Sequence, residues 1–215
     1  MNINKYIDHT NLKPTATEAD IEKLCREAIE NKFASVCINP CNIPIAKEIL
    51  KNSDVKVCTV IGFPLGANSL TIKAAETVEA YDMGCDEFDM VINIGALKDK
   101  KYDYVRDEIA AVVAAAKGKC VKVIIETGLL TDEEKVEAVR LSCEAGASFV
   151  KTSTGIMSTG ATVADVELMK KNVSNGTKVK ASGGIKTGAF ALELVNAGAD
   201  RLGTSAGTAI VSELN

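Results

Sequence analysis

The 215-residue sequence has one histidine, no tryptophan, and seven cysteines that form no Cys-x-x-Cys pair. With His9 as its single imidazole, the chain cannot build a zinc site from several histidines. The odd number of scattered cysteines predicts free, buried thiols in a reducing compartment. No apolar run approaches the roughly 18 residues of a membrane span, and no apolar region follows the first residues as in a secretory signal. These absences predict a cytoplasmic protein without a membrane partner.

Clusters of lysine and arginine interleaved with aromatic residues are also missing. Aromatic residues make up only 4% of the chain, and its net charge is -4. Nucleic-acid binding is therefore not expected. Hydrophobic residues at 47% and charged residues at 25% are ordinary values for a globular protein. At this length the chain is predicted to form a single domain over residues 1–215 with a sizeable core.

Eight strand-like segments alternate with eight helix-like segments along the chain. Apolar and β-branched runs predict the strands, and apolar residues at helical spacing predict the helices. Helix starts are indicated at Thr17, with Asp20 three residues later, and at Thr131, with Glu134 three residues later. Strands are expected over 6–10, 34–39, 55–62, 88–92 and 121–126, at Lys151, at Lys180 and over 201–203. Helices are expected after Thr17, over 43–51, 71–83, 102–116, 131–146, 163–172 and 188–197, and from about 206.

Two architectures fit eight alternating units, a closed (β/α)8 barrel and an open doubly wound sheet. Dividing 215 residues by eight leaves about 27 per unit, which accommodates a strand, a helix and two short loops. A barrel of this length is small but feasible. The open sheet lacks the Gly-x-Gly-x-x-Gly turn expected after its first strand. The predicted fold class is therefore α/β, a (β/α)8 TIM barrel.

Two lysines stand where an apolar strand gives way to small polar residues. Lys151 follows Val150, and Lys180 follows Val179. Burying an ammonium group is costly, so a buried lysine tends to release its proton and can then attack a carbonyl carbon. Either lysine alone is more simply a solvated surface charge. The pair indicates amine chemistry, and spacing alone does not say which lysine is the nucleophile.

An acidic residue, Asp89, lies in the apolar strand 88–92, and strand alternation directs its side chain into the barrel. A buried acid needs a cationic partner, which lysines reaching in from the sixth and seventh strands would supply. Asp89 is therefore a candidate for the reacting site, and a purely structural ion pair is the alternative.

Glycine-rich loops follow the seventh and eighth strands, where many barrels bind phosphate. Gly183 and Gly184 follow the Lys180 strand, and Gly203, Thr204 and Ser205 close the last strand. Backbone N–H groups in such loops can approach a phosphate dianion, assisted by the N-terminus of the next helix. These loops predict a phosphorylated substrate, although tight strand-to-helix turns alone would also favour glycine.

The sequence resembles the deoxyribose-phosphate aldolase family of Schiff-base aldolases over nearly its whole length. By position, the resemblance implies that Lys151 is the Schiff-base lysine, Lys180 the second active-site lysine and Asp89 the proton-relay acid. It also groups Thr154 and Gly155 with the phosphate-binding loops. The resemblance rests on five segments: Ile7-Asp8-His9-Thr10, Asp86-Glu87-Phe88-Asp89-Met90-Val91, Lys122-Val123-Ile124-Ile125-Glu126-Thr127, Phe149-Val150-Lys151-Thr152-Ser153-Thr154-Gly155 and Lys180-Ala181-Ser182-Gly183-Gly184-Ile185.

The resemblance implies reversible cleavage of 2-deoxy-D-ribose 5-phosphate to D-glyceraldehyde 3-phosphate and acetaldehyde, without a metal or organic cofactor. The expected partners are a phosphosugar and an aldehyde, and a homodimer is the assembly considered. Ile156 stands where some relatives carry a lysine, and the chain ends soon after Ser212 without the tyrosine-ended tail of some members. Two rival functions share such a barrel, a phosphosugar isomerase or synthase and a non-catalytic phospholigand-binding protein.

Overall fold

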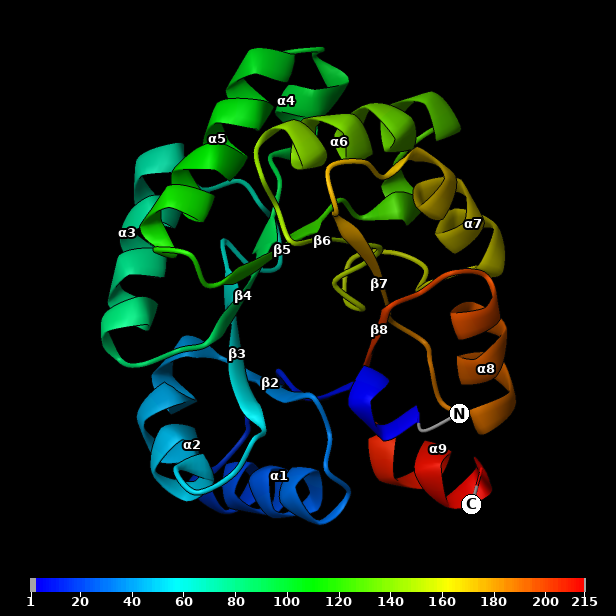
Figure 1. Ribbon diagram of the computed structural model, residues 1–215. Coiled ribbons are helices and arrows are strands. Elements are labelled where there is room, and N and C mark those ends of the chain that lie inside the picture. The colour runs from blue at the N-terminus through cyan, green and yellow to red at the C-terminus, as the bar shows by residue number, and fades with distance from the viewer. Residues whose placement is uncertain (1–2, 215) are drawn as a thin grey trace.

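The computed structural model describes residues 3–214, in which eight parallel strands pair in chain order and close into a barrel (Figure 1). β1 completes the ring by pairing with both β2 and β8, with Ile7 opposite Leu202 and His9 opposite Thr204. The closed ring confirms the predicted barrel and excludes the open doubly wound sheet. The strands are β1 (Ile7–Asn11), β2 (Ser35–Ile38), β3 (Lys56–Ile61), β4 (Glu87–Val91), β5 (Cys120–Ile124), β6 (Phe149–Lys151), β7 (Lys178–Ser182) and β8 (Arg201–Thr204).

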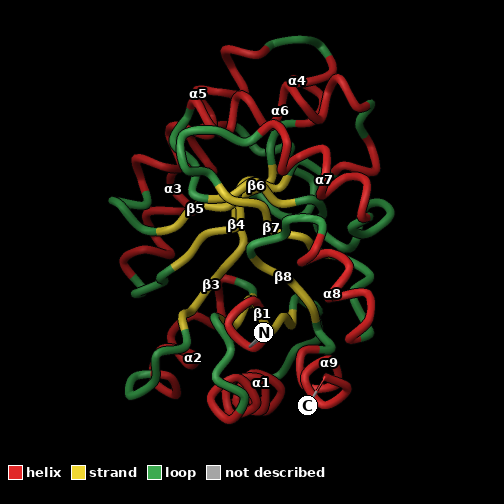
Figure 2. The backbone as a smooth tube through the Cα atoms, turned by 45° about the vertical axis from the view of Figure 1, so that its right-hand side comes forward, coloured by secondary structure: helices red, strands yellow, loops and turns green. Residues whose placement is uncertain are grey.

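Helices surround the barrel on its outer side, with the strands at the centre (Figure 2). None of the described helices combines the length and apolar character needed to cross a membrane. The α-helices are α1 (Glu18–Glu30), α2 (Ile43–Leu50), α3 (Leu70–Asp82), α4 (Ile94–Lys98), α5 (Tyr102–Ala115), α6 (Asp132–Glu144), α7 (Val163–Asn172), α8 (Gly188–Asn196) and α9 (Gly207–Leu214). Short 3-10 helices are η1 (Ile3–Tyr6), η2 (Pro40–Asn42) and η3 (Thr127–Leu129).

Two helices begin at the capping boxes that the sequence indicated. Thr17 caps α1 and Thr131 caps α6, and each threonine side chain accepts a hydrogen bond from the backbone N–H three residues later. The carboxylates of Asp20 and Glu134 in turn accept a hydrogen bond from the backbone N–H of the cap residue, which completes a capping box at both helices. These reciprocal bonds fix the point at which each chain segment turns from loop into helix.

Other elements were not indicated by the sequence pattern. The short helix α4 is capped by Asn93, whose side chain accepts a hydrogen bond of 2.9 Å from Ala96 N; five residues are too few to show a helical period. The first strand begins at Ile7 because Tyr6 belongs to η1. Glu126, expected at the end of a strand, lies beyond β5 with a left-handed φ of 55°. This conformation directs the buried Glu126 carboxylate toward the loop after β6, where it accepts a hydrogen bond from Thr154 N.

Charged side chains fill part of the barrel interior, whereas the apolar core lies between the strands and the helices. On β4, Phe88 and Met90 belong to the outer core, and Asp89 between them is fully buried. On β5, Val121 and Val123 belong to the same core, and Lys122 between them is fully buried. Strand alternation therefore places these two charged residues on the inner face. A buried charge persists only when it is paired, so the interior must hold balanced ions.

Candidate active site

Asp89 on β4 is the centre of the interior charge cluster. Its Oδ2 atom accepts hydrogen bonds from Lys151 Nζ at 2.8 Å and from Lys180 Nζ at 2.7 Å. Its Oδ1 atom accepts from Lys122 Nζ at 2.8 Å and from Cys58 Sγ at 3.1 Å. The structure therefore brings the three residues that the sequence singled out, Lys151, Lys180 and Asp89, into direct contact.

A second layer of charges lies below Asp89 and was missed by sequence reasoning. Lys180 Nζ lies 2.5 Å from Asp8 Oδ2 on β1, and Asp8 Oδ1 accepts from Arg201 Nε at 2.7 Å. The Arg201 guanidinium also donates to both carboxylate oxygens of Glu87 at 2.9 and 3.0 Å. Glu87 Oε2 lies 2.7 Å from Lys122 Nζ. Because each acid in this layer contacts a base, the buried charges are compensated.

The electrostatic environment holds the two deepest lysines as cations. Burial opposes ionisation of Asp89, but the attraction of its three ammonium neighbours outweighs burial and keeps its pKa well below the usual range. Burial also disfavours the charged form of Lys180, yet Asp8 and Asp89 raise the pKa of this lysine above its ordinary value. For Lys122, burial again disfavours the charged form, but Asp89, Glu87 and Asp8 together raise its pKa well above the ordinary value.

A cavity of about 360 Å³ opens at the C-terminal end of the strands, above the charge cluster. Among the three lysines that contact Asp89, Lys151 lines this cavity and keeps 4% of its surface exposed, whereas Lys122 and Lys180 are 0% exposed. Every residue predicted to bind phosphate also lines the cavity: Thr154, Gly155, Gly183, Gly184, Gly203, Thr204 and Ser205. The amine of Lys151 and the glycine-rich loops therefore share one space.

The loops after β6 and β7 form one wall of the cavity by close backbone packing. A Cβ atom on Gly160 would lie 2.1 Å from Gly183 O, and Ala161 N donates a 3.0 Å hydrogen bond to the same oxygen. Gly183 itself has a φ of 88°, a conformation that favours glycine. Side chains at these two positions would push the loops apart, so glycine fixes the wall.

Some backbone N–H groups around the cavity donate hydrogen bonds within the described part of the protein, and others do not. Thr154 N donates to Glu126 Oε2 at 2.9 Å, so this N–H is already engaged. The N–H groups of Gly155, Gly184 and Ser205 donate to no protein acceptor within residues 3–214. These three donors lie on three different loops around one cavity and can bind an anion there.

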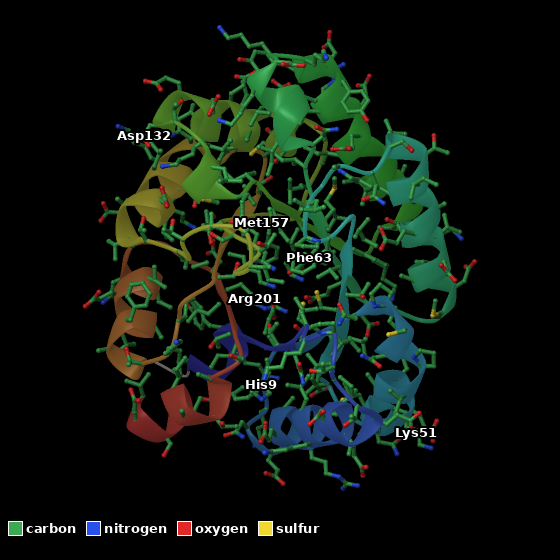
Figure 3. All side chains as sticks on the ribbon, turned by 180° about the vertical axis from the view of Figure 1, so that it is seen from behind. His9, Lys51, Phe63, Asp132, Met157 and Arg201 are labelled. Atoms are coloured by element: carbon green, nitrogen blue, oxygen red, sulfur yellow. The ribbon has the colours of Figure 1, made fainter. Side chains whose placement is uncertain are left out.

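The loop after β1 supplies the opposite side of the cavity and was also missed as part of the site. Residues 10–14 line the cavity, and this loop brings the apolar side chain of Leu12 and the exposed cation of Lys13 to the rim. Lys186 and Ile156 add a second cation and an exposed apolar side chain at the rim. Figure 3 shows Met157, next to Ile156 in the chain, over the middle of the barrel, whereas Lys51, just after α2, and Asp132, at the start of α6, lie on the outer side.

The family model described as DeoC/LacD family aldolase matches residues 3–213 of this chain. The chain belongs to this aldolase family. The family member from Clostridium tetani that is named deoxyribose-phosphate aldolase is 58% identical over 214 residues, covering 99% of both chains. Membership of this aldolase family agrees with the site, in which lysines and an acid lie at the base of a cavity.

Solved structures of family members share the whole barrel. The structure of a protein from Coccidioides immitis described as a deoxyribose-phosphate aldolase superposes with a TM-score of 0.97 at 44% identity, covering 99% of this chain and 85% of that one. The Aeropyrum pernix deoxyribose phosphate aldolase, described as a unique tetramer, has a TM-score of 0.92 at 35% identity, covering 99% and 90%. For the chain described here, the homodimer and the cytoplasmic location stay predictions.

Proposed function

We propose that this family member cleaves 2-deoxy-D-ribose 5-phosphate reversibly to D-glyceraldehyde 3-phosphate and acetaldehyde through a Schiff base on Lys151. The observation that carries the proposal is the position of Lys151, which lines the cavity while it contacts Asp89. Lys122 and Lys180 contact the same acid but do not line the cavity. A substrate carbonyl can therefore reach the amine of Lys151 more readily than that of either other lysine.

In the proposed reaction, the free amine of Lys151 attacks the aldehyde carbon of the open-chain sugar, and the carbinolamine loses water to give an iminium ion. The iminium accepts the electron pair of the bond between C2 and C3 as that bond breaks. Loss of the C3 hydroxyl proton then completes the release of glyceraldehyde 3-phosphate. The remaining enamine is protonated at C2, and hydrolysis of the new iminium releases acetaldehyde and regenerates the amine.

Asp89 and Lys180 are the proposed proton-transfer groups. Asp89 Oδ2 contacts the amines of both lysines, so a proton can pass from Lys151 to the carboxylate and back without a large movement. Lys180 is held charged by Asp8 and Asp89, and a charged amine cannot attack a carbonyl carbon. This pair therefore supports Lys151 as nucleophile and Lys180 as the permanently charged partner.

The phosphate group is proposed to bind between the loops that carry Gly155, Gly184 and Ser205. The unengaged backbone N–H groups of these residues support this assignment. Since Ile156 provides no charge, the cations of Lys13 and Lys186, which line the same cavity, are the side chains proposed to attract the dianion. Gly183, Gly203, Thr204 and Thr154 complete the wall of the proposed subsite.

The function is tested by mixing the enzyme with deoxyribose 5-phosphate and measuring acetaldehyde and glyceraldehyde 3-phosphate separately. Equal amounts of the two products are expected. Acetaldehyde with borohydride should inactivate the enzyme irreversibly, and neither reagent alone should do so. An isomerase, a synthase or a non-catalytic binding protein would form no acetaldehyde and would survive the combined treatment. Lys178 is an exposed lysine on the same strand as Lys180. Lys178→Leu is therefore the matched control for Lys151→Leu and should behave as the unmodified enzyme.

A further inference from the structure

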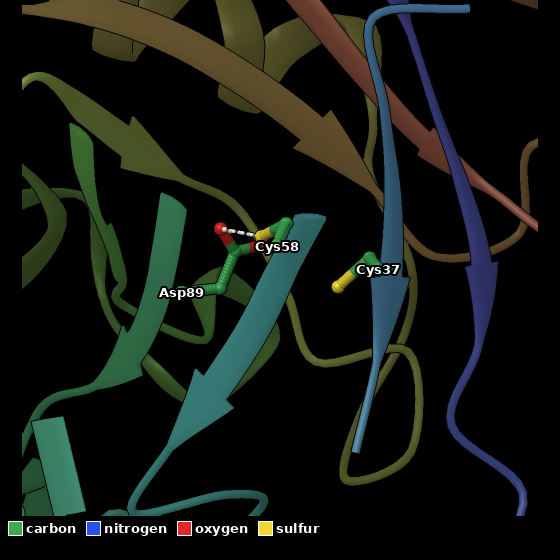
Figure 4. Close-up of side chains that lie close together, drawn as sticks. All are labelled: Cys37, Cys58 and Asp89. Carbon is green, nitrogen blue, oxygen red and sulfur yellow. Dashed lines mark hydrogen bonds between the residues drawn. The ribbon is translucent and has the colours of Figure 1, made fainter. Parts of the chain in front are cut away.

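Two cysteines face Asp89 from adjacent strands. Cys37 on β2 and Cys58 on β3 are directly paired in the register of the two strands. Both are fully buried, and their sulfur atoms and a carboxylate oxygen of Asp89 all lie within 4.8 Å of one another. Figure 4 shows the two sulfur atoms on the same side of the barrel interior as the Asp89 carboxylate, which accepts a hydrogen bond from Cys58 Sγ. The free, buried thiols expected from the sequence thus include a pair beside the proposed reacting groups.

The space beside these atoms is already suited to a cation. Lys122 Nζ contacts two of the three groups, Asp89 Oδ1 at 2.8 Å and Cys58 Sγ at 3.2 Å. The same ammonium group lies 2.7 Å from Glu87 Oε2 on its other side. A small cation that took over the Asp89 and Cys58 contacts would therefore leave Lys122 paired with Glu87.

We propose that Cys37, Cys58 and Asp89 form an inhibitory binding site for a thiophilic divalent cation of the zinc type. Two thiolates and one carboxylate are ligands that zinc and cadmium accept, and a fourth tetrahedral position is left for water or another donor. Binding displaces one proton from each thiol, so a dication replaces two protons and the net charge of the interior is unchanged. This inference is independent of the aldol reaction and goes beyond the proposed function.

The strand geometry favours metal binding over a disulfide between the two cysteines. Neighbouring strands lie about 4.8 Å apart, and directly paired side chains leave the sheet in nearly parallel directions. A disulfide needs Cβ atoms about 3.5–4.5 Å apart, whereas two sulfur ligands of a tetrahedral metal can stay farther apart because the ion lies between them. The site can therefore form with little backbone movement.

Binding at this site should inhibit because it acts on Asp89. Coordination through Oδ1 would place a dication on the carboxylate whose Oδ2 atom contacts Lys151 and Lys180. The carboxylate would then be a weaker proton acceptor for these lysines. The turnover number should fall, while KM for the phosphosugar changes little because the phosphate loops are not part of the metal site.

The experiment is a titration of the chelator-treated enzyme with Zn²⁺ or Cd²⁺ alone, followed by activity measurement and by reversal with excess chelator. Cys37→Ser and Cys58→Ser should each weaken inhibition at least about tenfold relative to their own metal-free activity. Cys41→Ser, which removes the exposed cysteine, is the control and should be inhibited like the unmodified enzyme. Equal inhibition of all three variants would overturn the site.

A second measurement uses the unmodified enzyme and does not depend on the folding of variants. Co²⁺ should produce the near-ultraviolet absorption of thiolate-to-cobalt charge transfer at one ion per chain, and Zn²⁺ should displace it. Bound Zn²⁺ should also protect Cys37 and Cys58 from alkylation, as mapped by peptide mass spectrometry under slow labelling. Absence of a thiolate band, or protection of other cysteines instead, would contradict the proposal.

Discussion

Lys151 and Lys180 are directly paired in the register between β6 and β7, and their amines donate to the same oxygen atom of Asp89. Their environments nevertheless differ. Lys180 also contacts Asp8 and is fully buried, whereas Lys151 lines the substrate cavity. Lys151 can therefore meet a substrate, whereas Lys180, which contacts Asp8 as well as Asp89, is held as a cation.

Replacement of the shared acid should affect turnover more than binding. Asp89→Asn keeps the side-chain shape but removes the charge that Lys151 and Lys180 contact, so proton transfer slows. We expect kcat to fall about 100- to 10,000-fold, with a small change in KM for deoxyribose 5-phosphate. Steady-state kinetics test this, and circular dichroism controls for folding. A variant with nearly normal kcat would show that Asp89 has only the structural role considered from the sequence.

Negative charge at the proposed phosphate subsite should affect one class of substrate. Ser205→Asp places a carboxylate beside the dianion, and we expect KM for deoxyribose 5-phosphate to rise at least about tenfold by repulsion. Turnover of unphosphorylated deoxyribose should change little. Ser205→Ala is the neutral control. Gly184→Asp is a less clean test, because Gly184 has a φ of 76° and an added side chain would also strain the loop. Equal losses on both substrates would place the phosphate elsewhere.

Exhaustive chelation should leave the aldolase activity unchanged, since the iminium on Lys151 supplies the electrophile that a metal would supply in other mechanisms. The measurement compares activity before and after chelator treatment, with total metal determined in both samples. An activity that falls with the metal content and returns when zinc is added would refute the lysine mechanism.

Asp8 is expected to stabilise the fold in a pH-dependent manner. Burial opposes its ionisation, but Lys180 and Arg201 outweigh burial and lower its pKa well below the ordinary value. An acid with a lowered folded-state pKa stabilises the protein above its unfolded pKa of about 3.9 and loses this contribution as the pH falls through the folded value. Asp8→Asn should therefore cost about 3–5 kcal/mol of unfolding free energy at pH 7.

Urea denaturation at a series of pH values measures this effect. The difference between Asp8→Asn and the unmodified protein should be constant above about pH 4 and should shrink in stronger acid, where protonated Asp8 resembles asparagine. The exposed acid variant Asp54→Asn should stay within about 0.5 kcal/mol throughout. A difference that does not depend on pH would mean that the charge of Asp8 is not what stabilises the fold.

Much of the barrel could be predicted because local signals are strong. Thr17 and Thr131 carry complete capping boxes, and the apolar strands are short and evenly spaced. Short irregular elements could not be predicted, because α4 depends on a single cap residue, Asn93, and the turn at Glu126 depends on a hydrogen bond to a distant loop. Whether residues 1–215 form a single domain stays a prediction.

The candidate site was predicted where polar residues end apolar strands and, at Asp89, where an acid lies inside one. Lys151 and Lys180 were found by that pattern, but Lys122 lies inside its strand between Val121 and Val123. Its role depends on strand register, which pairs it directly with Asp89. The Val-Lys-Val pattern was a usable signal, since a lysine between two buried valines faces the opposite side of the strand. Cys58 gave no such signal, because a cysteine in an apolar strand predicts only a buried thiol.

The central claim is that the amine of Lys151 forms the Schiff base, and the most direct test is to locate the trapped adduct. The enzyme is incubated with acetaldehyde and borohydride, digested, and mapped by peptide mass spectrometry. Lys180→Leu should still be trapped at Lys151, because Lys180 is not the attacking amine. An ethyl group on Lys151 alone is the predicted result in the unmodified enzyme, and an adduct on Lys122 or Lys180, or normal turnover by Lys151→Leu, would contradict the claim.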